Sequence, residues 1–139
     1  MTENELAKEV VDAAYHIHRK LGPGLLESVY ETLLAHELQK RSLSVKRQVP
    51  IEFAFDGIKF DQGFYADLLV EDKLIIEIKS TEEIHPAHKK QLTTYLRLAD
   101  LRLGLLINFG AAMIKQGIRR VVNGLKEDQL GVFAALREE

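Results

Sequence analysis

The sequence predicts an α/β domain with a mixed β-sheet flanked by helices and preceded by two further helices at the N-terminus. Apolar residues recur at helical spacing over residues 3–41, and the pattern then changes to the alternation of strands over residues 45–80. A helical segment over residues 86–99 is followed by a nearly continuous apolar run over residues 103–109. A strand, a helix and another strand in this order make a right-handed crossover between parallel strands, so the sheet contains both orientations.

The first two segments are amphipathic helices. From Glu3 to Lys20 the apolar residues are Leu6, Val10, Val11, Ala14, Ile17 and Leu21. Gly22-Pro23-Gly24 ends this helix, and a second helix with the same spacing runs from Leu25 to about Arg41. We therefore expect the two helices to form a tight corner.

The next segment predicts a β-hairpin. Val45 to Phe55 alternates between apolar and polar residues, and Asp56-Gly57 is a strong signal for a hairpin turn. Ile58 to Tyr65 should therefore return antiparallel, with a bulge at Gly63. Pro50 lacks an amide hydrogen, which indicates that the first of these strands lies at an edge of the sheet.

Two apolar segments, Ala66–Val70 and Leu74–Ser80, predict central strands joined by a short loop. A three-residue loop pairs Val70 with Leu74 and places Asp67 opposite Glu77, on one face of the sheet with Lys79. A two-residue loop would send Asp67 to the other face. We predict the three-residue loop, which requires Asp72 or Lys73 to adopt a left-handed conformation.

The rest of the chain completes the sheet. Pro86 to Ala99 predicts the crossover helix, and its inward stripe consists of Leu92, Tyr95, Leu96 and Ala99. Leu103 to Phe109 predicts a buried strand, Ile118 to Val122 a short edge strand, and Leu125 to Arg137 a weaker terminal helix.

Composition limits the function classes. With 139 residues, 46% of them hydrophobic and 29% charged, the chain predicts one globular domain over residues 1–139. The lack of cysteine excludes disulfides, thiolate zinc sites and a cysteine nucleophile. No apolar run approaches the ~20 residues that span a bilayer, so we expect a cytoplasmic protein without a membrane partner. A net charge of −2 means that nucleic acid could bind only through local basic patches.

Acidic residues and a lysine within the central strands indicate chemistry. Asp67 and Glu77 on rigid strands can hold Mg²⁺, a hard cation that prefers oxygen ligands. Lys79 can orient or deprotonate an attacking water and offset charge on a phosphorane. The alternative is a surface ion pair between Glu77 and Lys79, but charges among buried neighbours are costly without a partner or a functional cleft.

At these residues the sequence resembles the PD-(D/E)xK nuclease superfamily, and within it the small GxxExxY proteins. The matching stretches are Gly24-Leu25-Leu26-Glu27-Ser28-Val29-Tyr30, Arg47-Gln48-Val49-Pro50, Asp67 to Lys79, His88-Lys89-Lys90-Gln91-Leu92-Thr93-Thr94-Tyr95-Leu96 and Gly104-Leu105-Leu106-Ile107-Asn108-Phe109-Gly110. The resemblance implies a restriction-endonuclease-like core. Ala66 stands where the superfamily name has proline.

The resemblance also implies roles for individual residues. Asp67 and Glu77 correspond to the metal-binding acids, Ile78 to a residue that lends its carbonyl to the metal, and Lys79 to the catalytic lysine. Supporting groups implied by the resemblance are Glu27 on the second helix and Gln91 on an inward face of the crossover helix. The alternative for Glu27 is a first-turn residue that stabilises its helix only through the helix dipole.

Three further residues are supporting candidates with alternatives. Tyr30 either hydrogen-bonds a catalytic acid or packs in the core, and Tyr95 belongs either to the site or to the core. His88 shares a helix side with Gln91 and Tyr95. A zinc pair of His85 and His88 is disfavoured because no third ligand stands beside it.

The leading hypothesis is a Mg²⁺-dependent nuclease, with Mn²⁺ as a possible substitute, that hydrolyses phosphodiester bonds in nucleic acid, DNA being favoured over RNA. The alternative hypothesis is a catalytically inactive module with the same fold that binds nucleic acid or a protein partner. The sequence leaves open strandedness, endonuclease or exonuclease action, sequence specificity and oligomeric state.

Overall fold

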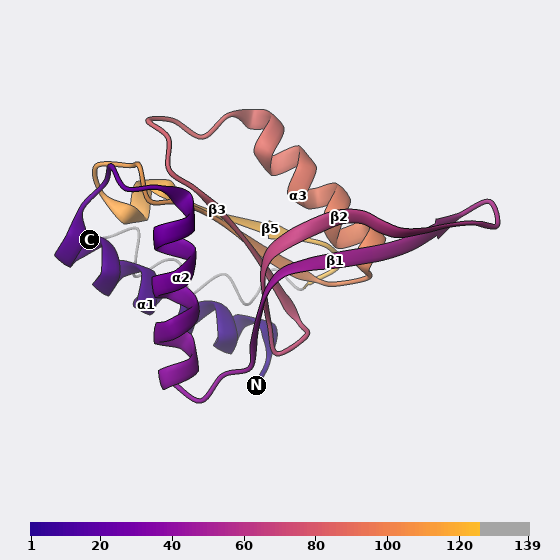
Figure 1. Cartoon of the computed structure of the whole chain (residues 1–139), viewed down its shortest axis with the longest axis horizontal. Helices are drawn as coiled ribbons and strands as arrows, with labels where there is room; N and C mark the ends of the chain where they lie inside the picture. Colours follow the sequence, from indigo (N-terminus) through magenta and orange to yellow (C-terminus); the bar gives the residue numbers. More distant parts are fainter. Residues whose placement is uncertain (126–139) are drawn as a thin grey trace.

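A computed structural model describes residues 1–125 of the chain (Figure 1). Its elements are α1 (Glu3–Leu21), α2 (Glu27–Lys40), β1 (Val45–Phe55), β2 (Ile58–Val70), β3 (Leu74–Lys79), α3 (Pro86–Ala99), β4 (Leu103–Asn108), the short 3₁₀ helix η1 (Ile114–Gly117) and β5 (Ile118–Val122). The predicted terminal helix, Leu125 to Arg137, lies outside the described residues except for Leu125. No helix within the described part is both long and apolar enough to cross a membrane.

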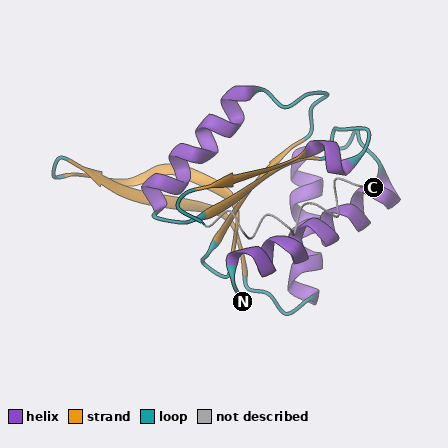
Figure 2. Cartoon of the chain, turned by 180° about the vertical axis from the view of Figure 1, so that it is seen from behind, coloured by secondary structure: helices purple, strands orange, loops and turns teal. Residues whose placement is uncertain are grey.

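The five strands form one mixed sheet in the order β1-β2-β3-β4-β5. The β3 and β4 strands are parallel, and the other neighbouring pairs are antiparallel. Helices α1 and α2 cover one face and α3 covers the other (Figure 2). This arrangement confirms the predicted mixed sheet and the edge position of the strand that contains Pro50.

The core is divided between the two faces of the sheet. The larger cluster packs α1 and α2 on the sheet and includes Leu6, Val10, Leu34, Leu38, Leu68, Ile76, Ile78 and Leu105. The smaller cluster packs α3 on the opposite face and includes Leu69, Ile75, Leu92, Leu96 and Leu106. Burying each side chain of this size contributes ~1.5–3 kcal/mol. Strands β3 and β4 are therefore held from both sides, which makes them rigid supports for charged residues at their ends.

The return strand of the first hairpin is longer than the sequence indicated. We predicted two separate segments, Ile58 to Tyr65 and Ala66 to Val70. In the structure, β2 is one continuous strand from Ile58 to Val70. Its last three residues, 68–70, pair with β1 and β3 at once, whereas the part before them pairs with β1 alone, so one strand serves two different environments. Because pairing continues across Tyr65, no turn interrupts it.

The irregularity predicted at Gly63 is present. The register shifts where Ile51 and Phe53 of β1 face Phe64 and Phe60 of β2, a stretch that includes Gly63. A Cβ atom at Gly63 would lie 2.2 Å from the ring of Phe53, so this ring occupies the space that a larger residue would need. The hairpin extends past the body of the protein as an arm (Figure 1).

Candidate active site

The register between β2 and β3 follows the three-residue loop. Val70 pairs with Leu74, and Leu68 pairs with Ile76, which confirms the predicted pairing. The left-handed residues are Glu71 and Asp72, with φ of 52° and 54°, so the prediction was right for Asp72 and missed Glu71.

Both left-handed residues are held by β1 and the segment before it. The Glu71 carboxylate accepts a hydrogen bond from the Ser44 amide at 2.7 Å, and Asp72 pairs with Lys46 at 2.9 Å. These contacts offset the unfavourable backbone conformation of a residue with a Cβ atom.

Beyond the pair Leu68 and Ile76, the carboxylates of Asp67 and Glu77, rather than backbone carbonyls, accept the hydrogen bonds between β2 and β3. The Asp67 amide donates to Oε2 of Glu77 at 2.9 Å, and the Ile78 amide donates to Oδ2 of Asp67 at 2.8 Å. Each acid therefore accepts a hydrogen bond from the strand that carries the other. The exchange brings the two carboxylates together at the point where β2 and β3 separate.

Burial makes the charged form of Glu77 unfavourable. Glu77 is only 7% exposed, and desolvation together with the nearby charge of Asp67 raises its pKa to about 8, although the Asp67 amide and Lys79 act in the opposite direction. At neutral pH, Glu77 therefore holds a proton unless a cation takes the place of that proton.

The donor set suits a hard divalent cation. Two carboxylates and the adjacent Ile78 carbonyl are oxygen ligands, as Mg²⁺ prefers, and water fills its other positions. Within residues 1–125 no cluster of three or more His, Asp or Glu side chains has the geometry of a metal site. A cation here would thus be held by the acid pair, a main-chain oxygen and water or substrate.

Lys79 ends β3 and is half-buried. In the described part of the chain it makes no ion pair with Glu77, which argues against a simple surface pair between them. Lys79 nevertheless lies close enough to lower the pKa of both Glu77 and His88. The ammonium group therefore remains available at the edge of the acid pair.

The end of β3 is fixed by Asn108, whose side chain is almost fully buried. Its Oδ1 accepts from the amides of Thr81 and Gly110, each at 3.0 Å, and its Nδ2 donates to the Thr81 carbonyl at 2.9 Å. Because Lys79 pairs with Asn108 in the parallel register, this amide extends the ladder beyond Lys79. A Cβ at Gly110 would come 2.1 Å from the Thr81 carbonyl, so only glycine fits there. We did not predict this role, although an asparagine ending an apolar strand was a signal for it.

Tyr30 organises the loop that leads into α2. Its hydroxyl donates to the Gly22 carbonyl at 2.6 Å and accepts from the Leu25 amide at 3.2 Å, while its ring stacks on Phe109 at 4.4 Å. Of the two alternatives for Tyr30, packing is therefore correct, and the hydroxyl bonds the backbone rather than a catalytic acid. Gly24 has φ of 110°, a conformation that residues with a Cβ rarely adopt.

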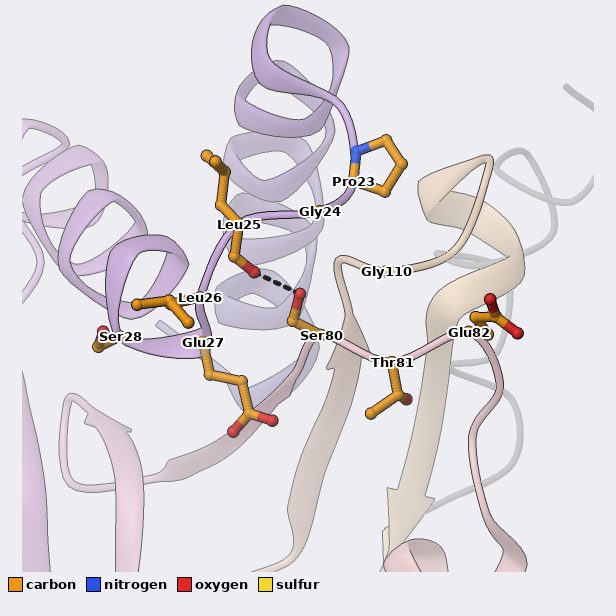
Figure 3. Close-up of a pocket in the computed structure, with 10 residues that line it drawn as sticks. All are labelled: Pro23, Gly24, Leu25, Leu26, Glu27, Ser28, Ser80, Thr81, Glu82 and Gly110. Carbon is orange, nitrogen blue, oxygen red and sulfur yellow. Dashed lines mark hydrogen bonds between the residues drawn. The ribbon is translucent and has the colours of Figure 1, made fainter.

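These contacts explain why α2 begins at Glu27 and not at Leu25 as predicted. The Leu25 amide is bonded to Tyr30, and the Leu25 carbonyl accepts from the Ser80 hydroxyl at 2.6 Å (Figure 3). Leu25 is thereby held out of the helix. Glu27 becomes the first residue of α2 and stays exposed.

Tyr30→Phe should lower the unfolding free energy by about 1–3 kcal/mol, because the Gly22 carbonyl and the Leu25 amide, which lie in a partly exposed loop, each lose a hydrogen bond. The stacked ring remains, so the core should not change. Chemical denaturation checks this value, with Tyr65→Phe as the control, since the Tyr65 hydroxyl bonds an exposed Gln62. Equal stability of Tyr30→Phe and the parent would show that the hydroxyl does not hold the loop.

An open hollow of about 680 Å³ lies beside this loop (Figure 3). Its walls are residues 23–28, residues 80–82 and Gly110. Glu27 lines it, and Ser80 follows directly after Lys79. The hollow therefore adjoins the lysine end of the acid cluster.

Helix α3 brings Tyr95 near the acid pair and His88 near Lys79. Burial, together with the charges of Glu77 and Asp67, raises the pKa of Tyr95, whose ring stacks on Phe64 at 3.8 Å. Burial and the nearby Lys79 lower the pKa of His88, while Glu27 acts in the opposite direction. Among described residues, the buried Nδ1 atom of His88 has no hydrogen-bond partner.

The inward stripe of α3 agrees with the prediction, but Gln91 does not. Leu92 and Leu96 are fully buried, and Tyr95 and Ala99 are partly buried against the same cluster. Gln91 is exposed, so the expected inward face for its amide is wrong. The reason is that Leu92, one position later, takes the inward direction, which leaves Gln91 on the open flank of the helix.

A second polar network at the acid pair was not predicted. Gln48 of β1 donates hydrogen bonds to Asp67 and to the buried Glu31 of α2, and Glu31 also binds Arg47. Arg47 and Gln48 lie in one of the stretches on which the resemblance rests, but alternation alone does not place neighbouring strand residues on one side.

Comparison with known proteins supports the fold. A family model described as PD-(D/E)XK nuclease superfamily matches residues 4–121. Among solved structures, the chain is similar to the crystal structure of SSO0001, with a TM-score of 0.51 and 19% sequence identity. This match covers 95% of the present chain and 65% of that chain, so the present chain spans less than two thirds of it. No curated protein matches the sequence.

Proposed function

Because the chain belongs to the PD-(D/E)XK nuclease superfamily, we propose that it is a Mg²⁺-dependent nuclease that hydrolyses phosphodiester bonds, with DNA as the favoured substrate. The observation that carries this proposal is the acid pair of Asp67 and Glu77, each bonded to the strand of the other, with Lys79 beside it. A buried carboxylate with a pKa of about 8 has little structural benefit, but it suits a site that exchanges a proton for a cation.

In this proposal Asp67, Glu77 and the Ile78 carbonyl hold Mg²⁺, and Mn²⁺ can replace it. The ion would lower the pKa of bound water and offset negative charge on the phosphate. Lys79, as a cation, would donate a hydrogen bond that orients the attacking water and would stabilise the charge that develops on the phosphorane oxygens, while the proton of that water passes to solvent.

The other candidate residues act around this centre. Glu27 lines the hollow beside Lys79, His88 is close enough to Lys79 and Glu27 for their charges to act on it, and Gln91 on the exposed flank of α3 would contact substrate. Tyr95 forms a wall beside the acids. The hollow next to Lys79 would receive the sugar and base beside the scissile bond rather than a further phosphate, since its lining holds Glu27 and Glu82 and no lysine or arginine.

The direct test is cleavage of a substrate panel in Mg²⁺ and in Mn²⁺. The panel contains single-stranded and double-stranded DNA and RNA, linear and closed circular, so that it separates endonuclease from exonuclease action. We expect metal-dependent cleavage of a DNA substrate that EDTA stops. A protein that binds Mn²⁺ at the acid pair and leaves the whole panel intact would contradict the proposal.

Metal binding should release a proton at neutral pH. Below a pKa of about 8 the cation must displace the proton of Glu77, so the apparent affinity should rise about tenfold per pH unit and level off above pH 8. Calorimetric titration with Mn²⁺ in buffers of different ionisation enthalpy measures the protons released. The expectation is about one proton at pH 6.5 and almost none at pH 9. Glu77→Gln should release none, and an affinity independent of pH would show that Glu77 is not a ligand.

A second candidate function is a catalytically inactive binding module with a protein partner, and the arm favours it. Phe53 pairs with Phe60 and Phe55 with Ile58, so these four side chains share one face of the two-stranded ribbon. Phe55 and Ile58 are 73% and 59% exposed, which is unusual for residues of this type. Such a module would bind its partner unchanged after Lys79→Met, whereas the nuclease would lose activity.

A further inference from the structure

We propose that Gln48 is a positioning residue that orients the Asp67 carboxylate for a divalent cation and is itself held by Glu31. The inference rests on the proposed metal site and adds a residue that acts through Asp67. It connects α2 through β1 to the acid pair on β2 and β3.

The hydrogen bonds of Gln48 determine the orientation of its amide. Nε2 donates to Oδ1 of Asp67 at 3.1 Å and to Oε1 of Glu31 at 2.6 Å. Both partners are carboxylate oxygens, which only accept, so the NH₂ group must face them. This group has two hydrogens, and the two carboxylates use both.

Asp67 is thereby held through both of its oxygens. Oδ1 accepts from Gln48, and Oδ2 accepts from the Ile78 amide at 2.8 Å. Each carboxylate oxygen has a further lone pair, so both can still coordinate a cation. The plane of the carboxylate is fixed before any cation arrives, which lowers the entropic cost of binding.

The anchor of Gln48 is itself held by several hydrogen bonds. Glu31 is buried, and its Oε2 accepts from Nε and Nη2 of Arg47 at 3.1 and 3.0 Å. Arg47 also donates to the Thr32 hydroxyl at 2.8 Å. The guanidinium offsets the charge of Glu31, so the anchor adds less negative charge near the acid pair than an unpaired carboxylate would.

The backbone at Gln48 supports a role for its side chain. Arg47 pairs with Leu68 and Val49 pairs with Ala66, which places Gln48 opposite Asp67. Gln48 has φ of 48°, a left-handed conformation within a strand that disfavours any residue with a Cβ. Side chains of adjacent strand residues normally point to opposite faces. The left-handed conformation of Gln48 lets its side chain and that of Arg47 both reach Glu31. If the backbone alone mattered, glycine would be the more favourable residue here.

The charge of the bridging group also fits the role. A lysine at this position would neutralise Asp67 and compete with the cation, and a glutamate would repel both carboxylates. A neutral amide orients Asp67 and leaves its negative charge for the metal.

The test compares the Mn²⁺ affinity and melting temperature of the full chain with those of four variants. Gln48→Gly and Gln48→Asn both suit a left-handed backbone, but the first has no side chain and the second is too short to reach both carboxylates. Asp100→Gly is the matched control, since Asp100 also has positive φ, of 56°, but caps the far end of α3. Asp67→Asn is the reference for loss of a metal ligand.

We expect both Gln48 variants to bind Mn²⁺ about tenfold or more weakly, as for other residues that orient metal ligands, and to melt close to the parent. Asp100→Gly should bind Mn²⁺ like the parent. If Gln48→Gly and Gln48→Asn bind Mn²⁺ within twofold of the parent, or if both melt far below Asp100→Gly, Gln48 serves the fold only and the inference is wrong. A parent that binds no Mn²⁺, or an Asp67→Asn protein that binds it equally well, would overturn the proposed metal site as well.

Discussion

Lys79→Met and Glu77→Gln should each reduce metal-dependent cleavage by about 10²–10⁴-fold, the usual effect of removing a group that transfers a proton or stabilises charge in the transition state. Lys79→Met keeps most of the aliphatic stem but loses the cation beside the attacking water. Glu77→Gln keeps the acceptor for the Asp67 amide and loses the negative charge that holds Mg²⁺.

The measurement is the single-turnover rate on the best substrate of the panel at saturating Mg²⁺. Lys59→Met and Glu52→Gln are the matched controls, because they make the same chemical changes at exposed positions of the arm. The two variants should also differ from each other in metal binding. Lys79→Met should bind Mn²⁺ as the parent does or more tightly, whereas Glu77→Gln should bind it weakly.

Two outcomes would contradict the assignment of catalysis to this cluster. If a folded Lys79→Met protein cuts at the parent rate while Glu77→Gln is inactive, Lys79 does not act on the nucleophile. If both cut at the parent rate, the activity arises elsewhere in the molecule.

The pairing of β2 with β3 could be predicted because the side chains of strands alternate and only one loop length brings Asp67 and Glu77 to the same face. The left-handed conformation of Glu71 could not, since it depends on the Ser44 amide, which is distant in sequence. The start of α2 was missed for a similar reason. Helical periodicity includes Leu25, but hydrogen bonds to Tyr30 and Ser80 hold that residue outside the helix.

The positions of the supporting residues Gln91 and Gln48 could not be predicted from the sequence. The exposed position of Gln91 depends on the rotation of α3 about its axis, and a shift of one residue changes an inward side chain into one on the flank. Gln48 reaches Asp67 only because its backbone leaves the ordinary strand conformation, and no periodic pattern encodes such an exception. The position of Gln91 and the backbone conformation of Gln48 are both local exceptions to periodic patterns, and such exceptions are expected at functional sites.

Glu77→Gln should also stabilise the metal-free protein, and by an amount that depends on pH. The pKa of Glu77 is about 8 in the folded chain, against an ordinary value of 4.5. Between these values the folded protein keeps a proton that the unfolded chain releases. The unfolding free energy of the parent should therefore fall as pH rises from 4.5 to 8 and change no further, for this group, above 8.

The size of the effect follows from the same two values. They differ by about 3.5 units, and each unit corresponds to about 1.4 kcal/mol, which sets an upper limit of roughly 5 kcal/mol. Water entering the gap between β2 and β3 would reduce this, so we expect Glu77→Gln to be more stable than the parent by about 2–4 kcal/mol at pH 8.5. Near pH 4.5 the two proteins should differ little.

Urea denaturation in EDTA at pH 5, 7 and 8.5 measures the difference, with Glu52→Gln as a control that should show none of this pH dependence. Saturating Mg²⁺ should then reverse the order at pH 8.5, because the cation stabilises only a protein that can bind it. A site selected for binding can hold a carboxylate that destabilises the metal-free protein, because the bound cation compensates its charge. Removal of such a group commonly raises stability at the cost of activity. If Glu77→Gln is less stable than the parent at pH 8.5 in EDTA, the carboxylate contributes to folding, and its burial is not explained by metal binding.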